Sequence, residues 1–283
     1  MALNRVGVAA LTSDPQTDLQ AGVPGSHSPK LTAIILTLNE EKHIEDCIRS
    51  LSWADEIVVF DSISEDRTVT LAEAAGATVL QSPFENYAQQ RNAALDAVET
   101  DWVFFVDADE RGSSELALEV RQLIADGQQA AWFVPRHNII FGKLTSGAGW
   151  YPDYQLRLFR HGLVTFERPV HETAVVQGET GHLKNPLLHY NYEDKAHFQA
   201  TQEAYTTYDA GILYQDGVRA RPHHYLSQPW RQFWWRYVTL KGYADGWHGL
   251  RLSVYMAYYE GVKYRKLARL WREDRPESGV QSP

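Results

Sequence analysis

The chain has 283 residues, the length of one elaborated domain or of about two average ones. It carries 27 Lys and Arg against 36 Asp and Glu, which gives a formal net charge of −9, and 44% of its residues are hydrophobic. This composition is typical of a globular protein with enough apolar residues for a core, and it argues against a disordered chain, a fibrous chain and a general nucleic-acid binder.

The first half of the chain alternates strand and helix patterns. Residues 1–29 show no periodicity, and we expect them to form a flexible leader. Apolar runs predict four strands, at 31–38, 56–61, 78–81 and 102–107. Helical spacing of apolar residues after each strand predicts helices that end near 51, 75, 98 and 125, the first of them capped by Asn39. This alternation predicts a mostly parallel sheet flanked by helices, with ligands at the carboxyl ends of the strands.

After residue 130 the pattern changes to short β-like runs. We expect antiparallel additions to the edge of the sheet at 131–135, 155–160, 164–167, 173–176 and 187–190. A helical tail follows, with Ser227 as its cap and Pro229 in its first turn, in two helices at about 228–241 and 249–272. The predicted organisation is a leader at 1–29, an α/β domain at 30–226 with its halves meeting near 130, a tail at 227–273 and a disordered end at 274–283.

A pair of carboxylates ends the fourth strand, in the run Asp107-Ala108-Asp109-Glu110. Residues i and i+2 of a strand point the same way, so Asp107 and Asp109 would face one point beyond the sheet. Two hard oxygen ligands with other positions left open suit Mg²⁺ or Mn²⁺ that bridges the phosphates of a substrate. The alternative is that these acids only cap the next helix.

Polar residues elsewhere in the first half allow two interpretations. Asp61 and Ser62 follow the second strand, where they would contact a ribose or a base, or only cap the next helix. Arg91 lies among small residues on the third predicted helix, where it would reach a phosphate or pair with a surface acid. There is no G-x-G-x-x-G run and no Walker loop, which argues against a dinucleotide oxidoreductase and a P-loop ATPase.

These segments together resemble the family 2 glycosyltransferases, which use nucleotide-diphosphate sugars on a Rossmann-like domain of the GT-A type. The resemblance covers residues 31–112. Its segments are Thr37-Leu38-Asn39-Glu40-Glu41, Asp61-Ser62, Gln90-Arg91-Asn92 and Asp107-Ala108-Asp109-Glu110. Within the family the chain is similar to lipopolysaccharide-core and β-glucosyltransferase-like enzymes, through looser matches at 154–160, 170–172, 188–190 and 243–246.

The resemblance implies a GT-A α/β fold with antiparallel edge strands and a helical C-terminal extension. It implies an inverting, metal-dependent transfer of a hexose from a UDP-sugar to a saccharide or glycolipid acceptor such as lipopolysaccharide core. The half at about 30–130 would bind the nucleotide and the half at about 131–226 the acceptor. The implied nucleotide-binding residues are Thr37, Asn39, Glu40, Asp61, Ser62, Arg91 and Asp107. The implied ligands of Mn²⁺ or Mg²⁺ are Asp107, Asp109 and His189.

The catalytic base is the point at which this sequence departs from the family. Many relatives place the base in a Glu-Asp pair at the start of a later helix, and that pair is absent here. The group that takes the proton of the acceptor hydroxyl must be a carboxylate or a histidine within hydrogen-bond reach. Glu172, in the run Val170-His171-Glu172, is the first choice and Asp153 the second. The alternative for Glu172 is an edge-strand residue that faces water.

The C-terminal tail is basic and aromatic. Between Arg231 and Arg272 there are nine Lys and Arg against two acids, and five of the nine tryptophans lie at 230–272. Trp230, Phe233 and Trp234 fall at helical spacing, with cations between them. Such a surface suits an anionic membrane interface, and the alternative is a helical lid packed on the α/β domain.

Two other functions compete with sugar transfer. A sugar-phosphate nucleotidyltransferase would need a Gly/Arg-rich loop together with a Lys directly after the first strand, and residues 37–43 contain no Gly or Arg. A non-catalytic nucleotide-sugar-binding or membrane-surface adaptor protein is opposed by the intact acid pair. The single cysteine, Cys47, is typical of a reducing compartment, and no run of 18 apolar residues is present. We therefore expect a cytoplasmic protein, with peripheral contact to the inner face of the cell membrane through residues 230–272.

Overall fold

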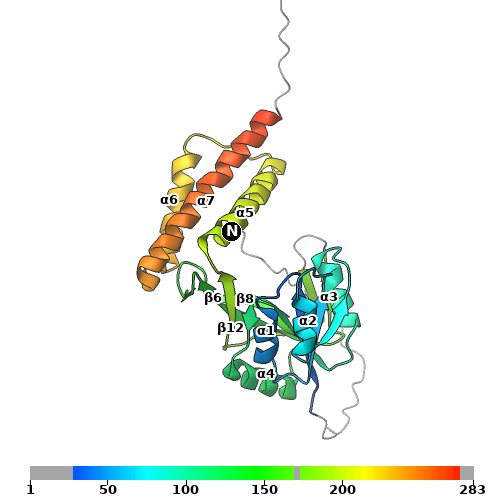
Figure 1. Cartoon of the computed structure of the whole chain (residues 1–283). Coiled ribbons are helices and arrows are strands. Elements are labelled where there is room, and N and C mark those ends of the chain that lie inside the picture. Colours follow the sequence, from blue (N-terminus) through cyan, green and yellow to red (C-terminus); the bar gives the residue numbers. More distant parts are fainter. Residues whose placement is uncertain (1–27, 169–172, 275–283) are drawn as a thin grey trace, which may run out of the picture. The chain divides into compact units, whose positions relative to one another are not determined.

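The computed structural model describes residues 28–168 and 173–274, and these residues form two compact units (Figure 1). The first, called the α/β unit, holds the described residues of 28–136 and 153–189. The second, called the helical unit, holds residues 137–152 and 190–274. Residues 190–226, expected in the α/β domain, thus group with the tail.

Four parallel strands form the centre of the α/β unit. Their order is β3-β2-β1-β4, and their bounds are β1 (Leu31–Thr37), β2 (Glu56–Asp61), β3 (Thr78–Gln81) and β4 (Trp102–Asp107). The predicted bounds are confirmed for β2, β3 and β4, and β1 ends one residue early. Residues 31–35 are all buried, because layers on both faces of the sheet cover this central strand. The α/β fold class is therefore confirmed.

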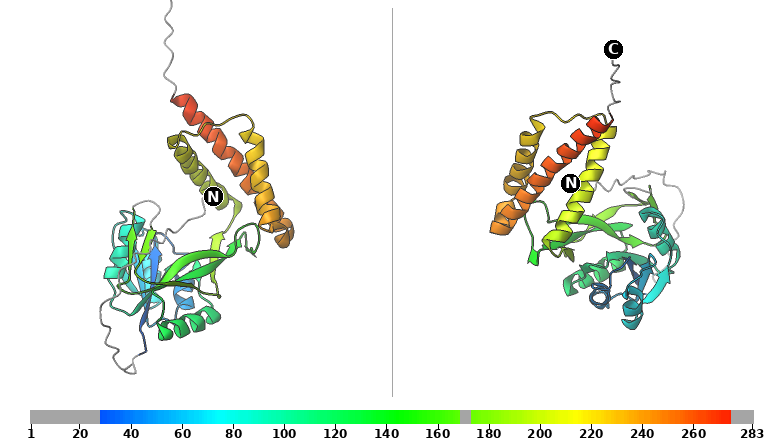
Figure 2. Two further views of the ribbon diagram at one scale, coloured as in Figure 1. Left: turned by 180° about the vertical axis from the view of Figure 1, so that it is seen from behind. Right: turned by 45° about the horizontal axis from the view of Figure 1, so that its top comes forward.

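Helices connect these strands and cover both faces of the sheet (Figure 2). They are α1 (Ile44–Ser50), α2 (Thr68–Ala74), α3 (Tyr87–Asp96) and α4 (Ser114–Asp126). Apolar residues of α1, α2 and α4 share one core cluster with Leu31, Ala33 and Ile35 of β1. Those of α3 share the other cluster with Ile34, because side chains alternate across a strand. The sheet thus separates two apolar layers.

The caps of these helices follow ordinary side-chain chemistry, with one correction. The side chains of Asn86 and Ser113 each accept a backbone N–H in the first turn of α3 and α4, and Gly127 ends α4 with a φ of 58°. The predicted cap of α1 is wrong. That helix begins at Ile44, and the side-chain oxygen of Asn39 accepts the N–H of Glu65, because the loops after β1 and β2 bond to each other.

Further strands continue the sheet beyond β4, in the order β4-β8-β6-β12-β5. They are β8 (Asp153–Arg160), β6 (Ala131–Ile140), β12 (Leu187–Tyr192) and the short β5 (Glu110–Arg111), with β11 (Thr180–His182) and β7 (Lys143–Leu144) paired to β6. The pairs β4/β8, β8/β6, β6/β7 and β12/β5 are antiparallel, whereas β11 runs parallel to β6. Two of the five predicted additions do not join this sheet: β9 (Val164–Glu167) and β10 (Thr173–Val176) pair with each other.

The sheet curls back toward its own centre. β5 is the last strand in the order of the sheet, yet in the sequence it begins at Glu110, only three residues after the end of β4 at Asp107. Its partner β12 is therefore brought to the carboxyl end of β4, with His189 opposite Glu110. This return places the end of β12 beside the predicted acid pair.

The helical unit is built on three helices that lie side by side (Figures 1 and 2). They are α5 (Lys195–Gln215), α6 (His224–Trp234) and α7 (Gly246–Glu273), with α7 packed against the other two. A π-helical turn η1 (Trp235–Thr239) and a 3₁₀ turn η2 (Gly242–Asp245) separate α6 from α7. The buried core includes Phe198 of α5 and Leu252 and Met256 of α7.

The expected break in the tail is confirmed, but the start of its first helix is not. The N–H of Ser227 donates to the carbonyl of His223 at 2.9 Å, so the helix already exists before residue 227 and Ser227 is not its cap. Pro229 lies inside α6 rather than in its first turn. None of the helices in residues 28–168 and 173–274 combines the length and the apolarity needed to cross a bilayer.

Candidate functional site

The polar ends of three parallel strands meet at one edge of the sheet. In the register of the sheet, Thr37 of β1 lies opposite Asp61 of β2, and Leu36 lies opposite Asp107 of β4. Because β1 lies between β2 and β4, all three ends open on the same edge, where parallel α/β sheets bind ligands. The structure therefore brings together Thr37, Asp61 and Asp107.

Asp61 is fully buried, and its carboxylate is surrounded by donors. It accepts hydrogen bonds from Thr37 Oγ1 at 3.0 Å, from the N–H of Ser64 at 2.8 Å and from Gln81 Nε2 at 3.0 Å. Burial acts to raise the pKa of Asp61, but the donors, Ser64 and Gln81 first among them, outweigh it and hold the pKa below its ordinary value. The carboxylate is thus ionised and fixed, and it can reach a ligand only if one of these bonds opens.

The loops after β1 and β2 are joined to each other. The N–H of Asn39 donates to Ser64 Oγ at 2.8 Å, and the N–H of Glu40 donates to Thr68 Oγ1 at 2.7 Å. Asn39 has a φ of 57°, a left-handed conformation that asparagine tolerates better than most residues. Ser62 is buried, and its hydroxyl accepts from Gln90. These hydrogen bonds hold the two loops together beside the ends of the strands.

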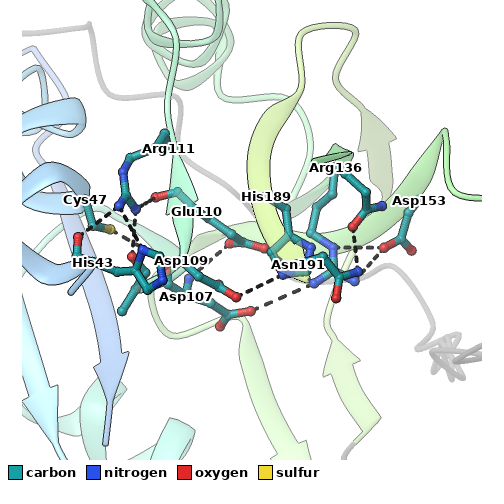
Figure 3. A network of polar contacts seen from close by, with 12 residues as sticks. His43, Cys47, Asp107, Asp109, Glu110, Arg111, Arg136, Asp153, His189 and Asn191 are labelled. Atoms are coloured by element: carbon teal, nitrogen blue, oxygen red, sulfur yellow. Dashed lines mark hydrogen bonds and ion pairs between the residues drawn. The ribbon is translucent and has the colours of Figure 1, made fainter. Parts of the chain in front are cut away.

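A buried charge network lies behind the acid pair, and its Asp107, Glu110, Arg136 and Asp153 can be followed in Figure 3. Arg157 of β8 is only 4% exposed, and it pairs with both carboxylate oxygens of Asp107 and with Glu110 at 2.9 Å. Glu110 is fully buried, and it also accepts the N–H of Asp107 at 3.0 Å and contacts Arg136 Nη1 at 3.4 Å. One guanidinium therefore holds two acids in fixed positions.

This network sets the charges at the end of β4. Burial acts to raise the pKa of Asp107, but the charge of Arg157 outweighs it and holds the pKa well below its usual range. For Glu110, burial is the largest cause, and its pKa is raised in spite of Arg157. The pKa of Arg157 is raised too, because its two acids outweigh the effect of burial. Asp107 is therefore ionised and already neutralised by Arg157.

Asp109 and His189 form the second feature of the site. Asp109 follows β4, His189 lies in β12, and Oδ2 of the first is 3.1 Å from Nε2 of the second (Figure 3). Two neighbouring ligands of an octahedral Mg²⁺ are about 3.0 Å apart, since each lies about 2.1 Å from the ion. In this structure a hydrogen bond joins the two atoms, and their separation is also that of two neighbouring ligands of one divalent cation. Residues 28–168 and 173–274 contain no group of three or more His, Cys, Asp and Glu so arranged.

The two residues predicted as the base have different outcomes. Glu172 lies outside the described residues. Asp153, at the start of β8, accepts two bonds on Oδ2 from Arg136, at 2.9 and 2.5 Å, and one on Oδ1 from Gln155 at 2.9 Å. Asp153 can take a proton only if the ion pair with Arg136 loosens.

Arg91 lies on α3 and packs against aromatic rings. Its guanidinium is 5.1 Å from the ring centre of Phe105 and 5.4 Å from that of Phe166. Its charge is among the causes that lower the pKa of Asp107 at the end of β4. These contacts with two aromatic rings help to hold the guanidinium in position.

Sequence reasoning assigned no role to Glu110, Arg136 or Arg157. The position of Arg157 could have indicated a buried ion pair, because it is the one charged residue in the otherwise apolar and buried run at 156–159. A buried cation needs an acid partner. Which acid that is depends on the pairing of β8 with β4, about which the local sequence says nothing. Arg136 carried no such signal.

The sequence matches a known family over a range that includes the parallel strands. The family described as glycosyl transferase family 2 matches residues 32–168. A lipopolysaccharide core biosynthesis glycosyltransferase, LpsC of Rhizobium meliloti, is 30% identical over 236 residues, which cover 77% of this chain and 87% of that protein. The chain is a family 2 glycosyltransferase. The family resemblance read from its strand-end motifs is confirmed.

Other proteins are similar to this glycosyltransferase to different degrees. An uncharacterized glycosyltransferase of Rickettsia bellii is 41% identical over 269 residues, which cover 89% of this chain and 90% of that one. A solved structure of glucosyl-3-phosphoglycerate synthase from Mycobacterium tuberculosis, in complex with Mn²⁺, UDP and glucosyl-3-phosphoglycerate, matches with a TM-score of 0.43 at 18% identity. That match covers 75% of this chain and 88% of the other.

Proposed function

We propose that this glycosyltransferase moves a hexose from a UDP-sugar to a saccharide or glycolipid acceptor of the lipopolysaccharide-core type, with inversion at the anomeric carbon. The observation that carries the proposal is the pair formed by Asp109 and His189, 3.1 Å apart at the end of β4. The acceptor class is supported by the relative LpsC, which is named for lipopolysaccharide core biosynthesis and is similar over most of both chains.

The residues at the end of β4 fit Mn²⁺ or Mg²⁺. Asp109 and His189 would be its protein ligands, and the remaining positions would be taken by phosphate oxygens and water. When bound, such an ion neutralises the charge that develops on a departing diphosphate. Asp107 is the weaker candidate ligand, because Arg157 already engages both of its carboxylate oxygens. We therefore assign Asp107 chiefly to the nucleotide.

The chain's own groups would orient the nucleotide before any chemistry. Asp61 and Thr37 would lie on the uracil side, supported by the joined loops that contain Asn39, Glu40 and Ser62. Arg91 would place its positive charge near the diphosphate. Arg157 would hold Asp107 in one rotamer, so that the acid is ready when the nucleotide arrives.

Inversion requires a base beside the incoming hydroxyl. The base takes the proton while the hydroxyl oxygen forms the new bond to the anomeric carbon and the diphosphate leaves from the opposite face. We propose Glu172 for this role, with Asp153 as the alternative. We also propose that the reaction takes place in the cytoplasm.

The test is a panel of nucleotide sugars with Mn²⁺ and lipopolysaccharide-core oligosaccharide, scored for release of nucleoside diphosphate and for the anomer formed. The variants Asp109→Asn and His189→Ala should lose both turnover and Mn²⁺-dependent binding of UDP. The control Asp126→Asn removes an exposed carboxylate of α4 in the same unit and should change neither. Full Mn²⁺-dependent UDP binding by Asp109→Asn would refute the metal assignment, and a product of retained configuration would refute inversion.

The base needs a separate experiment. Glu172→Gln should keep UDP binding and lose transfer, whereas Asp153→Asn should keep most of the transfer rate. If Asp153→Asn abolishes transfer with UDP binding intact while Glu172→Gln does not, the roles are reversed.

A further inference from the structure

Helix α6 exposes apolar side chains along its length. It has no buried residue, although it contains Leu226, Trp230, Phe233 and Trp234. Leu226 is 79% exposed, Trp230 64% and Trp234 53%. These three, together with the exposed Val238 of η1, follow at four-residue intervals, the spacing of a single ridge along a helix. We call these four residues the exposed ridge.

Aromatic rings extend the exposed ridge into a continuous strip. The ring centre of Trp230 is 6.2 Å from that of Trp234 and 6.1 Å from that of Phe233. Phe233 lies 5.4 Å from Tyr237, which lies 6.3 Å from the exposed Tyr243 of η2. Trp and Tyr are the residues enriched where protein meets the headgroups of a bilayer, because their rings are apolar and carry one polar atom.

The charge of this segment differs from that of the chain. Residues 217–244 contain no Asp or Glu, while the chain as a whole carries −9. Four cations of the segment are exposed, namely Arg219, Arg221, Arg231 and Lys241. The fifth, Arg236, is buried and donates to the carbonyl of Ala148 at 2.6 Å. The segment that carries the strip is therefore cationic and contributes no acid of its own.

A second copy of the chain fits this surface less well. The common symmetric dimer places the same surface of both copies face to face. The cations of this segment, such as Arg231 and Lys241, would then face a surface of the partner copy that is equally cationic and has no acid of the segment to compensate, and like charges in contact are unfavourable. An anionic surface has no such conflict.

We propose that the exposed ridge and its aromatic strip rest on the surface of a bilayer that contains anionic lipid. The rings and Leu226 would enter the boundary between headgroups and acyl chains, and the cations would meet the lipid phosphates. The contact is interfacial, since the polar residues of α6 between the ridge positions keep the helix in the plane of the surface. The membrane contact itself does not depend on sugar transfer, although a glycolipid acceptor would be met on the same surface.

The test is flotation of the full chain with vesicles of phosphatidylcholine alone and of phosphatidylcholine mixed with phosphatidylglycerol. The chain should float with the mixed vesicles at low salt and less so at high salt, because salt screens the attraction. Trp230→Ser combined with Trp234→Ser should weaken binding roughly tenfold or more, since the apolar area that enters the interface is lost. Arg231→Glu combined with Lys241→Glu should weaken it at least about fivefold for each cation removed.

Matched controls lie in the α/β unit. Leu118→Ser removes an apolar side chain of α4 that is as exposed as Trp230, and Lys184→Glu reverses an exposed cation. Neither should change flotation. All variants should keep the turnover of the parent chain on a water-soluble acceptor.

Three results would overturn the membrane proposal. The first is no flotation with mixed vesicles, and the second is equal flotation of the double tryptophan variant. The third is a concentration-dependent dimer, seen by light scattering, that this variant abolishes without any vesicle binding by the parent chain. Flotation without turnover on any nucleotide sugar would instead count against the proposed sugar transfer alone.

Discussion

Replacing Arg157 by methionine should be among the most destabilising single changes in the α/β unit. The change removes the cation shared by Asp107 and the fully buried Glu110, and methionine keeps most of the side-chain volume. Removing one partner of a buried ion pair costs about 3–5 kcal/mol, because the other charge stays buried without compensation. The Asp107 side chain is 36% exposed, so most of this cost arises at Glu110.

The assay is urea unfolding followed by circular dichroism and by tryptophan fluorescence, so that separate transitions of the two units can be recognised. Arg121→Met is the matched control. Arg121 pairs with Asp55 at 2.8 Å, but both side chains are at least one third exposed, so its loss should cost no more than about 1 kcal/mol.

A second variant and the pH dependence make the reasoning refutable. Arg157→Met combined with Glu110→Gln should recover much of the loss, because no buried charge then remains at Glu110. In the single variant the folded-state pKa of Glu110 rises further above its unfolded value. Above the raised pKa that Glu110 has in the parent fold, the folded variant still binds a proton that the folded parent has released, so the loss of stability relative to the parent should grow as pH rises beyond that value. Unfolding free energies within about 1 kcal/mol of the parent chain, or a loss that does not depend on pH, would refute this account.

Three further predictions concern a backbone contact, an acid and the metal. In thermal unfolding, Gly249→Ala should destabilise the helical unit by about 1–3 kcal/mol, because the added Cβ would collide with the carbonyl of Gly242. Gly211→Ala in α5 is the control: its added Cβ meets no atom, and it should stabilise the unit by about 0.5–1 kcal/mol. Asp61→Asn should destabilise the α/β unit at neutral pH and much less in acid. The depressed pKa of Asp61 contributes stability above the unfolded value of 3.8 that is lost as pH falls through the folded value, so a gap that persists unchanged into acid would contradict it. His189→Ala should lower the affinity of the UDP-loaded protein for Mn²⁺ by at least about tenfold in calorimetry, and unchanged affinity would exclude His189 as a ligand.

The parallel core was predictable from sequence because its signals are local. The buried strands β2, β3 and β4 are short apolar runs, and their bounds were predicted to the residue. Helix α5 was not predicted. Its 21 residues include several threonines and tyrosines, and a single stripe of apolar residues is hard to recognise in them. The start of α6 was misplaced, because the turn at 222–226 forms without a conventional cap.

The functional site also has some features that local sequence predicted and others that depend on strand pairing. Their nearness in the sequence identified Asp107 and Asp109 as a pair at a strand end, and both lie within the range that matches the family. The nearness of His189 to Asp109 is produced by the pairing of β12 with β5. The sequence around Asp109 and the sequence around His189 give no indication that the two side chains lie close together.

Local sequence thus determined the family, the strands of the parallel core and the residues that stand at their ends. Only the tertiary structure determined which charged side chains of the site pair with one another. Arg157 lies 50 residues from Asp107 along the chain and reaches it only because β8 runs antiparallel beside β4. The energy of a buried charge depends on which groups surround it in space, and those neighbours come from strands that sequence order does not place side by side.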